Sequence, residues 1–394
     1  MKKTVLLFES RDLCYESNRY FTACLEEAFM SFGYPVEVCD LSEHMEMKLE
    51  DVLKHQKRYL LAIDFNSLLP RLELEDGQPY LEALDVPFYD YLVDHPLYHH
   101  AALKRIPEKH SVICIDTCHQ DYVRQYYPSI KHSIYLPLGA MQAEFERSFS
   151  QKRLELLFLG TYDPEEEFYQ ELSEYPHDKK QEVSALIELM QADSELTQEQ
   201  ALKLYLKSKN EEISQKEFAG RLNHDYLADL YLRNKNRKET VLAAADAGIP
   251  FTIIGHGWNQ VKGLNQKQIE IKNGIGFAAS IQVMADAKIL LNSTPLFHGG
   301  LHDRVYSAMI NHTVCVTEGS RFARQKFSDG EEAVFYNLDR LFLLPEKLNY
   351  LYENPKQAER IAECAFQKVM KNESWQKRME QFQNYTCSIR ENLV

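Results

Sequence analysis

Glycine and proline are scarce in this chain of 394 residues, which contains 15 and 14 of them. A low-complexity or linker-dominated chain would contain many more of both. Long apolar runs are also missing, and none approaches the roughly 18 residues of a membrane-spanning helix. The basic start Met1-Lys2-Lys3 is followed by the apolar run TVLLF, which is too short for a signal peptide. We therefore expect a globular cytoplasmic protein with no integral membrane segment.

The motifs of several enzyme classes are absent. No G-x-S-x-G, Walker A, H-E-x-x-H or EF-hand pattern occurs, which argues against hydrolase, ATPase and metalloprotease activities. Of the eight cysteines, Cys114 and Cys118 are spaced like a loose metal-binding pair, but no second pair follows at zinc spacing. We expect reduced thiols that are mostly buried, with no bound metal and no cofactor.

The charge balance is acidic. Asp and Glu total 59 and Lys and Arg total 45, which gives a net charge of -14. A nucleic-acid-binding domain usually carries a basic patch, so we expect no nucleic-acid partner. A local cationic site for a small anion remains compatible with this balance. The length suggests two or three domains.

Strand-like and helix-like segments alternate along the first part of the chain. The apolar runs expected to form strands cover 4–10, 35–40, 60–66, 86–94, 111–116 and 133–139. Apolar residues at helical spacing predict a helix over 18–32, which stops at Gly33. Such alternation indicates a parallel sheet covered on both faces. Residues 1–148 are therefore predicted to be a Rossmann-like domain.

A second alternating series predicts a second Rossmann-like domain over 149–375. Its expected strands are 154–160, 249–257, 268–272, 288–293, 313–317 and 333–336, with helices over 236–247 and 303–311. Residues 163–232, rich in Glu, Gln, Lys and Leu, interrupt the series and predict a helical insertion. The last helix, 376–394, is expected to pack back on the first domain. The fold class is thus α/β, with two doubly wound domains facing a central cleft.

Ligands of open α/β sheets bind at the carboxyl ends of the strands, where helix N-termini favour anions. In the second domain, Gly255 and Gly257 follow a strand directly, but Gln260 breaks the G-x-G-x-x-G fingerprint. These glycines allow either a tight strand exit or the close approach of a phosphate. Arg237 and Lys238 lie in a basic run at the start of the predicted helix 236–247, where they form either a solvated face or a phosphate contact.

The stretch 290–320 carries the strongest signal. A strand ends at Asn292, a polar loop contains His298 and Gly300, and a helix begins near Asp303, which we expect to be its N-cap. His298, His302 and Asp303 are metal-ligand types, but they lack the spacing that zinc enzymes use.

Polar residues also follow a strand of the first domain. Asp94 and His95 come directly after 86–94, where either residue is suited to act as a general base. The alternative is a loop of solvated polar side chains. Asp64 and Asp116 end two other strands of this domain.

Several short elements follow one another in a familiar order. They are VDHP (93–96), YLPLGA (135–140), LFLGTY (157–162), IIGHGW (253–258), LLN (290–292), RVYSA (304–308) and SWQKR (374–378). In order and context they resemble the CgeB-like (spore-maturation type) glycosyltransferases, which have the two-domain GT-B fold. The resemblance covers both halves of the chain and excludes 163–232. It implies that 1–148 is the acceptor-side domain and that 149–375 is the nucleotide-sugar-binding domain.

One position departs from this family. The glutamate that binds donor ribose or sugar hydroxyls in related enzymes is Ser307 here, and a Glu-x7-Glu pair is replaced by Gly299 and Ser307. The resemblance then implies that the donor is held differently, by Asp303 or Arg304, or that activity is altered or lost.

The resemblance implies a metal-independent transferase that moves a sugar from a nucleotide-diphosphate sugar to the hydroxyl of a glycan, protein or small molecule. It leaves two alternatives, a sugar-nucleotide epimerase and a non-catalytic nucleotide- or glycan-binding protein. The insertion would cover the acceptor or pair two chains into a homo-oligomer. The expected donor site comprises Gly160, Arg237, Lys238, Gly255, His256, Gly257, Trp258, Asn292, His298, Gly300, Asp303, Arg304 and Ser307.

Overall fold

The computed structural model describes residues 3–10, 16–294 and 296–391, with side chains up to residue 386. The chain divides into two compact units. Unit 1 comprises Met1–Gly139, Gln215–Asn223 and Trp375–Val394, and unit 2 comprises Ala140–Ser214 and His224–Ser374. The division after Gly139 lies nine residues before the boundary expected from the sequence.

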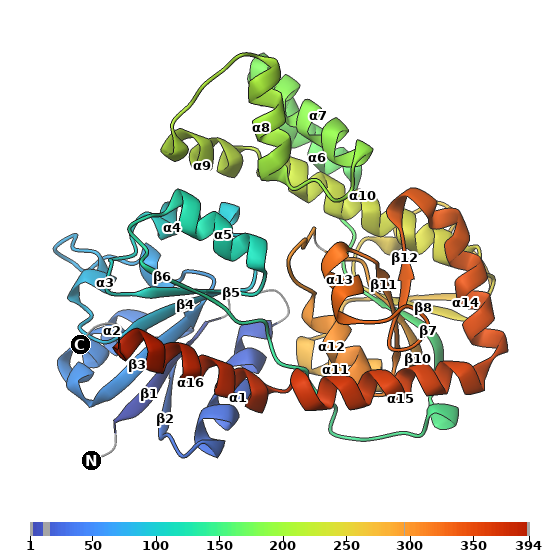
Figure 1. Ribbon diagram of the computed structural model, residues 1–394, viewed down its shortest axis with the longest axis horizontal. Helices are drawn as coiled ribbons and strands as arrows, with labels where there is room; N and C mark the ends of the chain where they lie inside the picture. Colours follow the sequence, from blue (N-terminus) through green and yellow to red (C-terminus); the bar gives the residue numbers. More distant parts are fainter. Residues whose placement is uncertain (1–2, 11–15, 295, 392–394) are drawn as a thin grey trace. The chain divides into compact units, whose positions relative to one another are not determined.

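Unit 1 is built on a six-stranded sheet in the order β2-β1-β3-β4-β5-β6, and every neighbouring pair is parallel (Figure 1). Its strands are β1 (Thr4–Glu9), β2 (Val36–Asp40), β3 (Tyr59–Phe65), β4 (Phe88–Leu92), β5 (Ser111–Cys114) and β6 (His132–Tyr135). Its helices are α1 (Ser17–Ser31), α2 (Met45–His55), α3 (Tyr80–Ala83), α4 (His100–Leu103), α5 (Thr117–Tyr126), α9 (Gln215–His224) and α16 (Trp375–Glu391). The central strands are buried along almost their whole length, because helices cover both faces of a parallel sheet.

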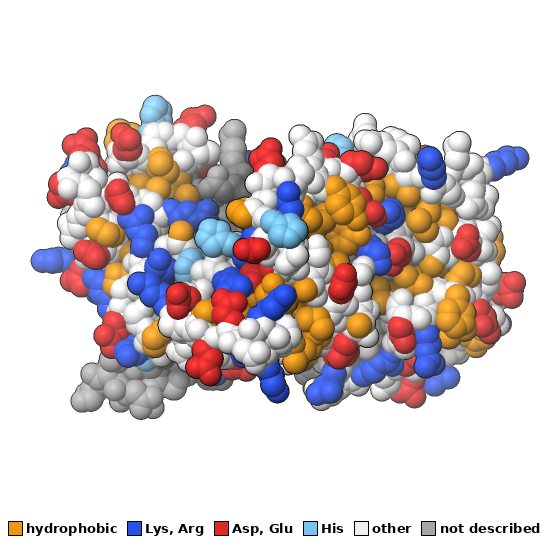
Figure 2. Space-filling view, turned by 90° about the horizontal axis from the view of Figure 1, so that it is seen from above, with side chains coloured by type: hydrophobic (Ala, Val, Ile, Leu, Met, Phe, Trp, Pro, Cys, Tyr) orange, Lys and Arg blue, Asp and Glu red, His pale blue; other side chains and the backbone are white. Residues whose placement is uncertain are grey.

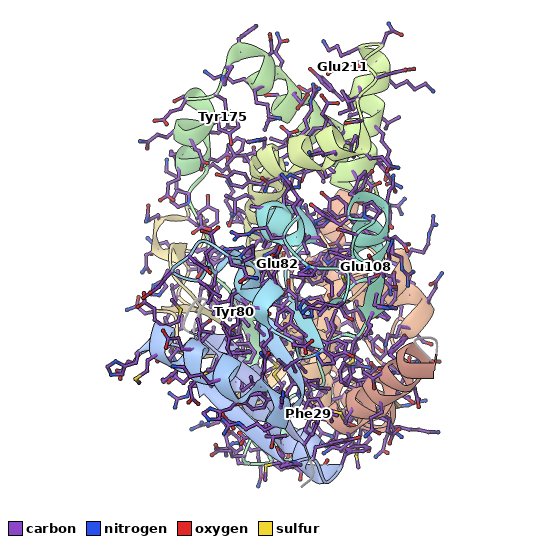
Figure 3. All side chains as sticks on the ribbon, turned by 90° about the vertical axis from the view of Figure 1, so that its left-hand side faces the viewer. Phe29, Tyr80, Glu82, Glu108, Tyr175 and Glu211 are labelled. Atoms are coloured by element: carbon purple, nitrogen blue, oxygen red, sulfur yellow. The ribbon has the colours of Figure 1, made fainter. Side chains whose placement is uncertain are left out.

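The terminal helix α16 packs on unit 1. Phe382 of α16 lies edge-on to Phe29 of α1, with ring centroids 6.0 Å apart (Figure 3 labels Phe29). The Arg378 guanidinium donates a 3.3 Å hydrogen bond to the carbonyl oxygen of Leu138. A Cβ on Gly139 would lie 2.6 Å from the indole of Trp375, so only glycine fits under this ring.

Unit 2 has a second six-stranded parallel sheet, in the order β12-β11-β10-β7-β8-β9 (Figure 1). Its strands are β7 (Leu154–Leu159), β8 (Phe251–Ile254), β9 (Ile269–Lys272), β10 (Ala287–Leu291), β11 (Val314–Glu318) and β12 (Val334–Tyr336). Around the sheet lie α11 (Phe277–Ala285), α12 (Asp303–Ile310), α13 (Arg321–Lys326), α14 (Leu344–Glu353) and α15 (Pro355–Asn372). The predicted fold class, two doubly wound α/β domains, is confirmed.

The insertion between β7 and β8 is helical, as predicted. It contains α6 (Glu165–Ser173), α7 (His177–Ala192), α8 (Gln198–Ser208) and α9, and it leads into α10 (Tyr226–Ala245). Tyr175 and Glu211, which Figure 3 labels, lie in the turns after α6 and α8. Of these helices, α9 belongs to unit 1, where Phe218 stacks on Tyr126 with ring centroids 5.2 Å apart. Asn223 adds a 2.7 Å hydrogen bond to the carbonyl oxygen of Leu97.

The predicted start of the helix at 236 is wrong, because α10 begins at Tyr226. Its second half packs into the core of unit 2 through Val241 and Ala244, while its first half carries the insertion. Just before α10, the buried carboxylate of Asp225 lies 2.6 Å from the Lys179 ammonium. One continuous helix therefore serves both the insertion and the sheet.

The surface shown in Figure 2 mixes hydrophobic patches with charged side chains of both signs. Within the described part of the chain, no helix combines the length and apolar character needed to cross a membrane.

Candidate functional site

The order of the strands identifies the ligand-binding edge of unit 2. Strand β7 is flanked by β8 on one side and by β10 on the other, so the chain winds away from β7 in both directions. In open α/β sheets, ligands bind at the carboxyl ends of the strands at such a switch point. The residues that follow β7 and β10 and those that begin α12 therefore lie at this ligand-binding edge.

The exits of β7 and β8 run side by side beyond the sheet. The Gly160 N–H donates to the carbonyl oxygen of Ile254, and the Tyr162 N–H donates to that of His256, both at 3.0 Å. A Cβ on Gly257, where φ is 83°, would overlap the carbonyl oxygen of Tyr162. Gly255 approaches Gly160 just as closely. Of the two roles that the sequence allowed for the G-x-G pattern, the geometry therefore supports the tight strand exit.

Trp258 does not line a ligand site, which corrects the expectation from the sequence. Its side chain is fully buried in the core of unit 2. The ring lies 5.4 Å from the rings of Phe158 and Tyr162, and its Nε1–H donates a 2.6 Å hydrogen bond to the carbonyl oxygen of Gly160. The indole holds the exit of β7 in place. His256, two residues earlier, is exposed.

Arg304 joins the end of β7 to the first turn of α12. Its Nη1 donates a 2.5 Å hydrogen bond to the carbonyl oxygen of Leu159, and its Nη2 lies 3.2 Å from His302 Nε2. Burial lowers the pKa of Arg304, but a guanidinium whose ordinary pKa is about 12.5 remains charged at neutral pH. The switch point of unit 2 therefore carries a fixed positive charge.

The N-cap of α12 is His302, not Asp303 as predicted. Asp303 is the first helical residue, and its Oδ1 lies 2.7 Å from His302 Nδ1. Burial opposes ionisation of Asp303, but His302 and Arg304 outweigh it and lower the pKa of the carboxyl. Burial and the nearby Arg304 lower the pKa of His302, which favours a neutral ring.

A second guanidinium reaches the same exit loop from α10. Arg237 Nη1 donates to the carbonyl oxygen of Thr161, and its Nε lies 3.7 Å from the position that a Cβ of Gly160 would occupy. Lys238, its neighbour, forms an ion pair with Glu165, which neutralises much of its positive charge at this exit. Both basic residues lie in the middle of α10, so the prediction that they occupy a first helical turn is wrong.

Two further expected site residues are structural. Asn292 is fully buried and donates a 2.9 Å hydrogen bond from Nδ2 to Thr317 Oγ1. Ser307 is also fully buried, and its Oγ accepts the Met141 N–H at 3.3 Å. Asn311, one turn later, donates to the Met141 carbonyl oxygen at 2.8 Å. Ser307 thus links the segment at Met141 to α12, and its side chain is buried away from any bound nucleotide sugar.

The loop before α12 contains the other expected residues of this domain. His298 and Gly300 lie in the segment that leads from β10 to α12. Gly300 is buried and His298 is partly buried. Within the described residues, no group of three or more His, Cys, Asp or Glu side chains is arranged to hold a metal ion.

The ligand-binding edge of unit 1 brings Asp94 and His95 together with residues from neighbouring strands. Asn66 Nδ2 donates a 2.8 Å hydrogen bond to Asp94 Oδ2. His95 Nδ1 accepts the Leu97 N–H at 3.0 Å, and its ring centroid lies 4.4 Å from that of His119. These contacts fix the directions of Asp94 and His95 at the ends of β4.

Asn66 was missed as a partner of Asp94, although it follows β3 directly. It has a φ of 55°, and Ser67 has a φ of 60°. Two consecutive non-glycine residues in the left-handed region are unusual and store strain. Ser67 is held by Asp90, whose carboxylate accepts the backbone N–H at 2.8 Å and the hydroxyl at 2.5 Å.

The two other strand-end carboxylates of unit 1, Asp64 and Asp116, are structural. Asp64 is buried beside Asp90 in the β3–β4 pair and accepts the Leu69 N–H at 2.7 Å. Burial, reinforced by Asp90, raises the pKa of Asp64 well above its ordinary value. Asp116 is the N-cap of α5 and accepts the Cys118 N–H at 2.6 Å.

Sequence reasoning also missed Glu318. It is the last residue of β11, and the signal that could have found it is the same strand-end position that drew attention to Asp94.

Comparison with known proteins agrees with this geometry. Residues 233–384 match the family described as "Glycosyl transferase-like". The matched segment includes Arg237, the exit of β8, β10 and α12. The search of curated proteins gives no match.

Solved structures match nearly the whole chain. Sucrose-phosphate synthase from Thermosynechococcus elongatus is 11% identical, with a TM-score of 0.57, over 99% of this chain and 100% of that one. Anabaena HepE in complex with UDP and glucose is 10% identical, with a TM-score of 0.54, over 98% and 100%. An alpha-glucosyltransferase in complex with UDP-glucose and DNA is 11% identical, with a TM-score of 0.57, over 98% and 100%. Together with the family match, this likeness confirms the predicted glycosyltransferase and its GT-B fold.

Proposed function

We propose that this chain transfers a sugar from a nucleotide-diphosphate sugar, bound by unit 2, to an acceptor hydroxyl bound by unit 1. The observation that carries the proposal is the convergence of Arg237 and Arg304 on the exit of β7. This exit lies at the switch point of the unit 2 sheet. Residues 233–384, which include both arginines, match a glycosyl transferase-like family. Paired guanidiniums are well suited to a diphosphate, because each offers several directed N–H donors.

The departing nucleoside diphosphate gains negative charge as the glycosidic bond breaks. Fixed positive groups that already face this charge lower the barrier, because they need no reorganisation during the reaction. The N-terminus of α12 adds its dipole to the charges of the two arginines. These groups supply the electrostatic stabilisation without a metal ion, so we propose a metal-independent reaction.

For unit 1, we propose that Asp94 or His95 deprotonates the acceptor hydroxyl. The position and orientation of the two residues support this role. Both follow β4, the Asn66 amide donates to the Asp94 carboxylate, and the Leu97 N–H donates to the His95 ring. A positioned base of this kind contributes about 10²–10⁴ to the rate of an inverting transfer.

Within the glycosyltransferases we propose kinship with the CgeB-like enzymes. The motifs that suggested the resemblance support this kinship by lying at strand and helix boundaries: Asn292 follows β10, Arg304 lies in the first turn of α12, and Trp375 begins α16. The burial of Ser307 supports a donor site that does not use this helix position.

The proposal is tested with a panel of UDP-, GDP-, dTDP- and CDP-sugars and the intact chain. A thermal shift first identifies donors that bind, because a ligand of the native state raises the midpoint. Release of nucleoside diphosphate and formation of a glycosylated product are then expected for at least one donor. Interconversion of the sugar without release would instead indicate an epimerase, and binding without either reaction would indicate a binding protein.

A further inference from the structure

Glu318 ends β11 at the ligand-binding edge of unit 2. In the parallel pairing, Val316 lies opposite Leu291, the last residue of β10, so Glu318 extends two residues beyond that level. On its other side it pairs with Tyr336 of β12, whose hydroxyl donates a 2.9 Å hydrogen bond to the carbonyl oxygen of Asn292. Glu318 therefore belongs to the same edge as the two arginines, two strands away from β7.

The side chain of Glu318 is enclosed but has no partner. It is only partly exposed, and within the described part of the chain its carboxylate forms neither a hydrogen bond nor an ion pair. Arg324, in the helix that follows β11, is engaged elsewhere: it donates to the carbonyl oxygen of Gly319 at 2.8 Å and to Asn337 Oδ1 at 2.7 Å.

A second carboxylate, that of Glu195, acts electrostatically on Glu318. Glu195, in the turn between α7 and α8, accepts the Arg321 N–H at 3.3 Å, which brings the insertion to the end of β11. Burial raises the pKa of Glu318 to about 7, and Glu195 contributes to the rise. An enclosed carboxyl without a partner costs stability, so its presence at a ligand-binding edge suggests that a ligand supplies the missing donors.

Hydroxyl groups are the hydrogen-bond donors that fit a carboxylate without a protein partner at this edge. A nucleotide sugar presents adjacent hydroxyls on its ribose and on the transferred sugar, and both oxygens of one carboxylate can accept from such a pair. Ser307 cannot accept these hydroxyls, because it is fully buried and bonded to Met141.

We infer that Glu318 binds adjacent hydroxyls of the donor nucleotide sugar at the end of β11. This inference rests on the proposed function and adds a residue that determines which donor binds. The shared chemistry is a pair of neighbouring hydroxyls, and the experiment distinguishes the ribose from the transferred sugar.

The test uses the donor that the wild-type chain selects from the panel, together with its nucleoside diphosphate. Isothermal titration is performed on Glu318→Ala, Glu318→Gln and the control Glu353→Gln, an exposed residue at the end of α14. Loss of hydrogen bonds to a charged group should weaken donor binding about 10- to 150-fold in Glu318→Ala. Weaker binding of both ligands assigns the ribose, and weaker binding of the nucleotide sugar alone assigns the transferred sugar.

A thermal measurement separates binding from a structural role. Because the carboxyl lacks a protein partner, Glu318→Gln should unfold at the same temperature as the wild type or higher. A lower midpoint for Glu318→Gln, or unchanged donor affinity in a folded Glu318→Ala, overturns the inference and leaves the proposed function intact. If the wild type binds no donor, the proposed function fails and this inference fails with it.

Discussion

Arg304 of α12 donates a hydrogen bond to the carbonyl oxygen of Leu159, the last residue of β7, across 2.5 Å. The bond links the first strand of the unit 2 sheet to the first turn of a helix 144 residues further along the chain. It places a guanidinium at the switch point and fixes its orientation through the Leu159 carbonyl. Arg237 reaches the next carbonyl but one, that of Thr161, from α10. These two arginines carry the positive charge of the proposed donor site.

Replacing Arg237 with alanine should weaken binding of the nucleoside diphosphate. Loss of a charge-assisted bond to phosphate costs about 1.5–3 kcal/mol, which is about 10- to 150-fold in affinity. Isothermal titration measures the effect. Lys288→Ala is the matched control, because Lys288 pairs with Glu155 at 2.7 Å at the opposite, amino-terminal edge of the same sheet. Equal affinities for the two variants would remove Arg237 from the site.

Introducing a glutamate at position 307 should unfold the protein, not activate it. Ser307→Glu would enclose an unpaired charge where the hydroxyl now accepts the Met141 N–H, which we expect to cost about 3–5 kcal/mol. Ser307→Ala should cost only about 1 kcal/mol. Thermal unfolding compares both with Ser208→Glu, an exposed substitution on α8. A Ser307→Glu variant that is as stable as the wild type would show that this position opens to the ligand.

The carboxyl pair in unit 1 should make stability depend on pH. Burial raises the pKa of Asp64, and it raises that of Asp90 to about 6. A carboxyl whose pKa is raised on folding stabilises the native state below its unfolded pKa, about 3.9, and this contribution is lost as the pH rises through the folded value.

Asp64→Asn removes one of these ionisations while keeping an oxygen to accept the Leu69 N–H. The midpoint of this variant should therefore improve relative to the wild type between pH 4.5 and pH 8. Asp85→Asn, an exposed substitution in the same unit, should show no such trend. A difference between Asp64→Asn and the wild type that stays constant with pH would contradict the assignment.

Asp94→Asn and His95→Ala should lower turnover about 10²–10⁴-fold for the residue that acts as the base, with donor affinity nearly unchanged. Steady-state rates and titrations on the same preparations separate the two effects. His95→Ala also removes the acceptor of the Leu97 N–H, so its unfolding midpoint should be recorded alongside. Wild-type turnover in both variants would leave these residues as loop-stabilising groups.

The sequence predicts the two sheets well because their strands are apolar runs with clear polar ends. Buried parallel strands such as β3 and β7 need continuous hydrophobic sequence, which is easy to recognise. The start of α10 could not be recognised, since helix-forming residues continue from the insertion into Arg233 without a break.

The candidate site is less visible because strand-end position does not reveal burial. Trp258, Asn292 and Ser307 all lie in promising motifs, yet each is fully buried and bonded to the backbone or to a neighbouring strand. Glu318 occupies an equally promising strand end and remains partly exposed. Distinguishing these residues requires the packing of strands and helices that are distant in sequence.

The most direct test of the account is the release of nucleoside diphosphate from the selected donor by wild type, Arg304→Ala and Lys288→Ala. Each variant must first show a folded spectrum and a cooperative unfolding transition. We predict release by the wild type and by Lys288→Ala, and a loss of at least about 10-fold in Arg304→Ala. Equal release by Arg304→Ala and Lys288→Ala would contradict the placement of the donor at the exit of β7.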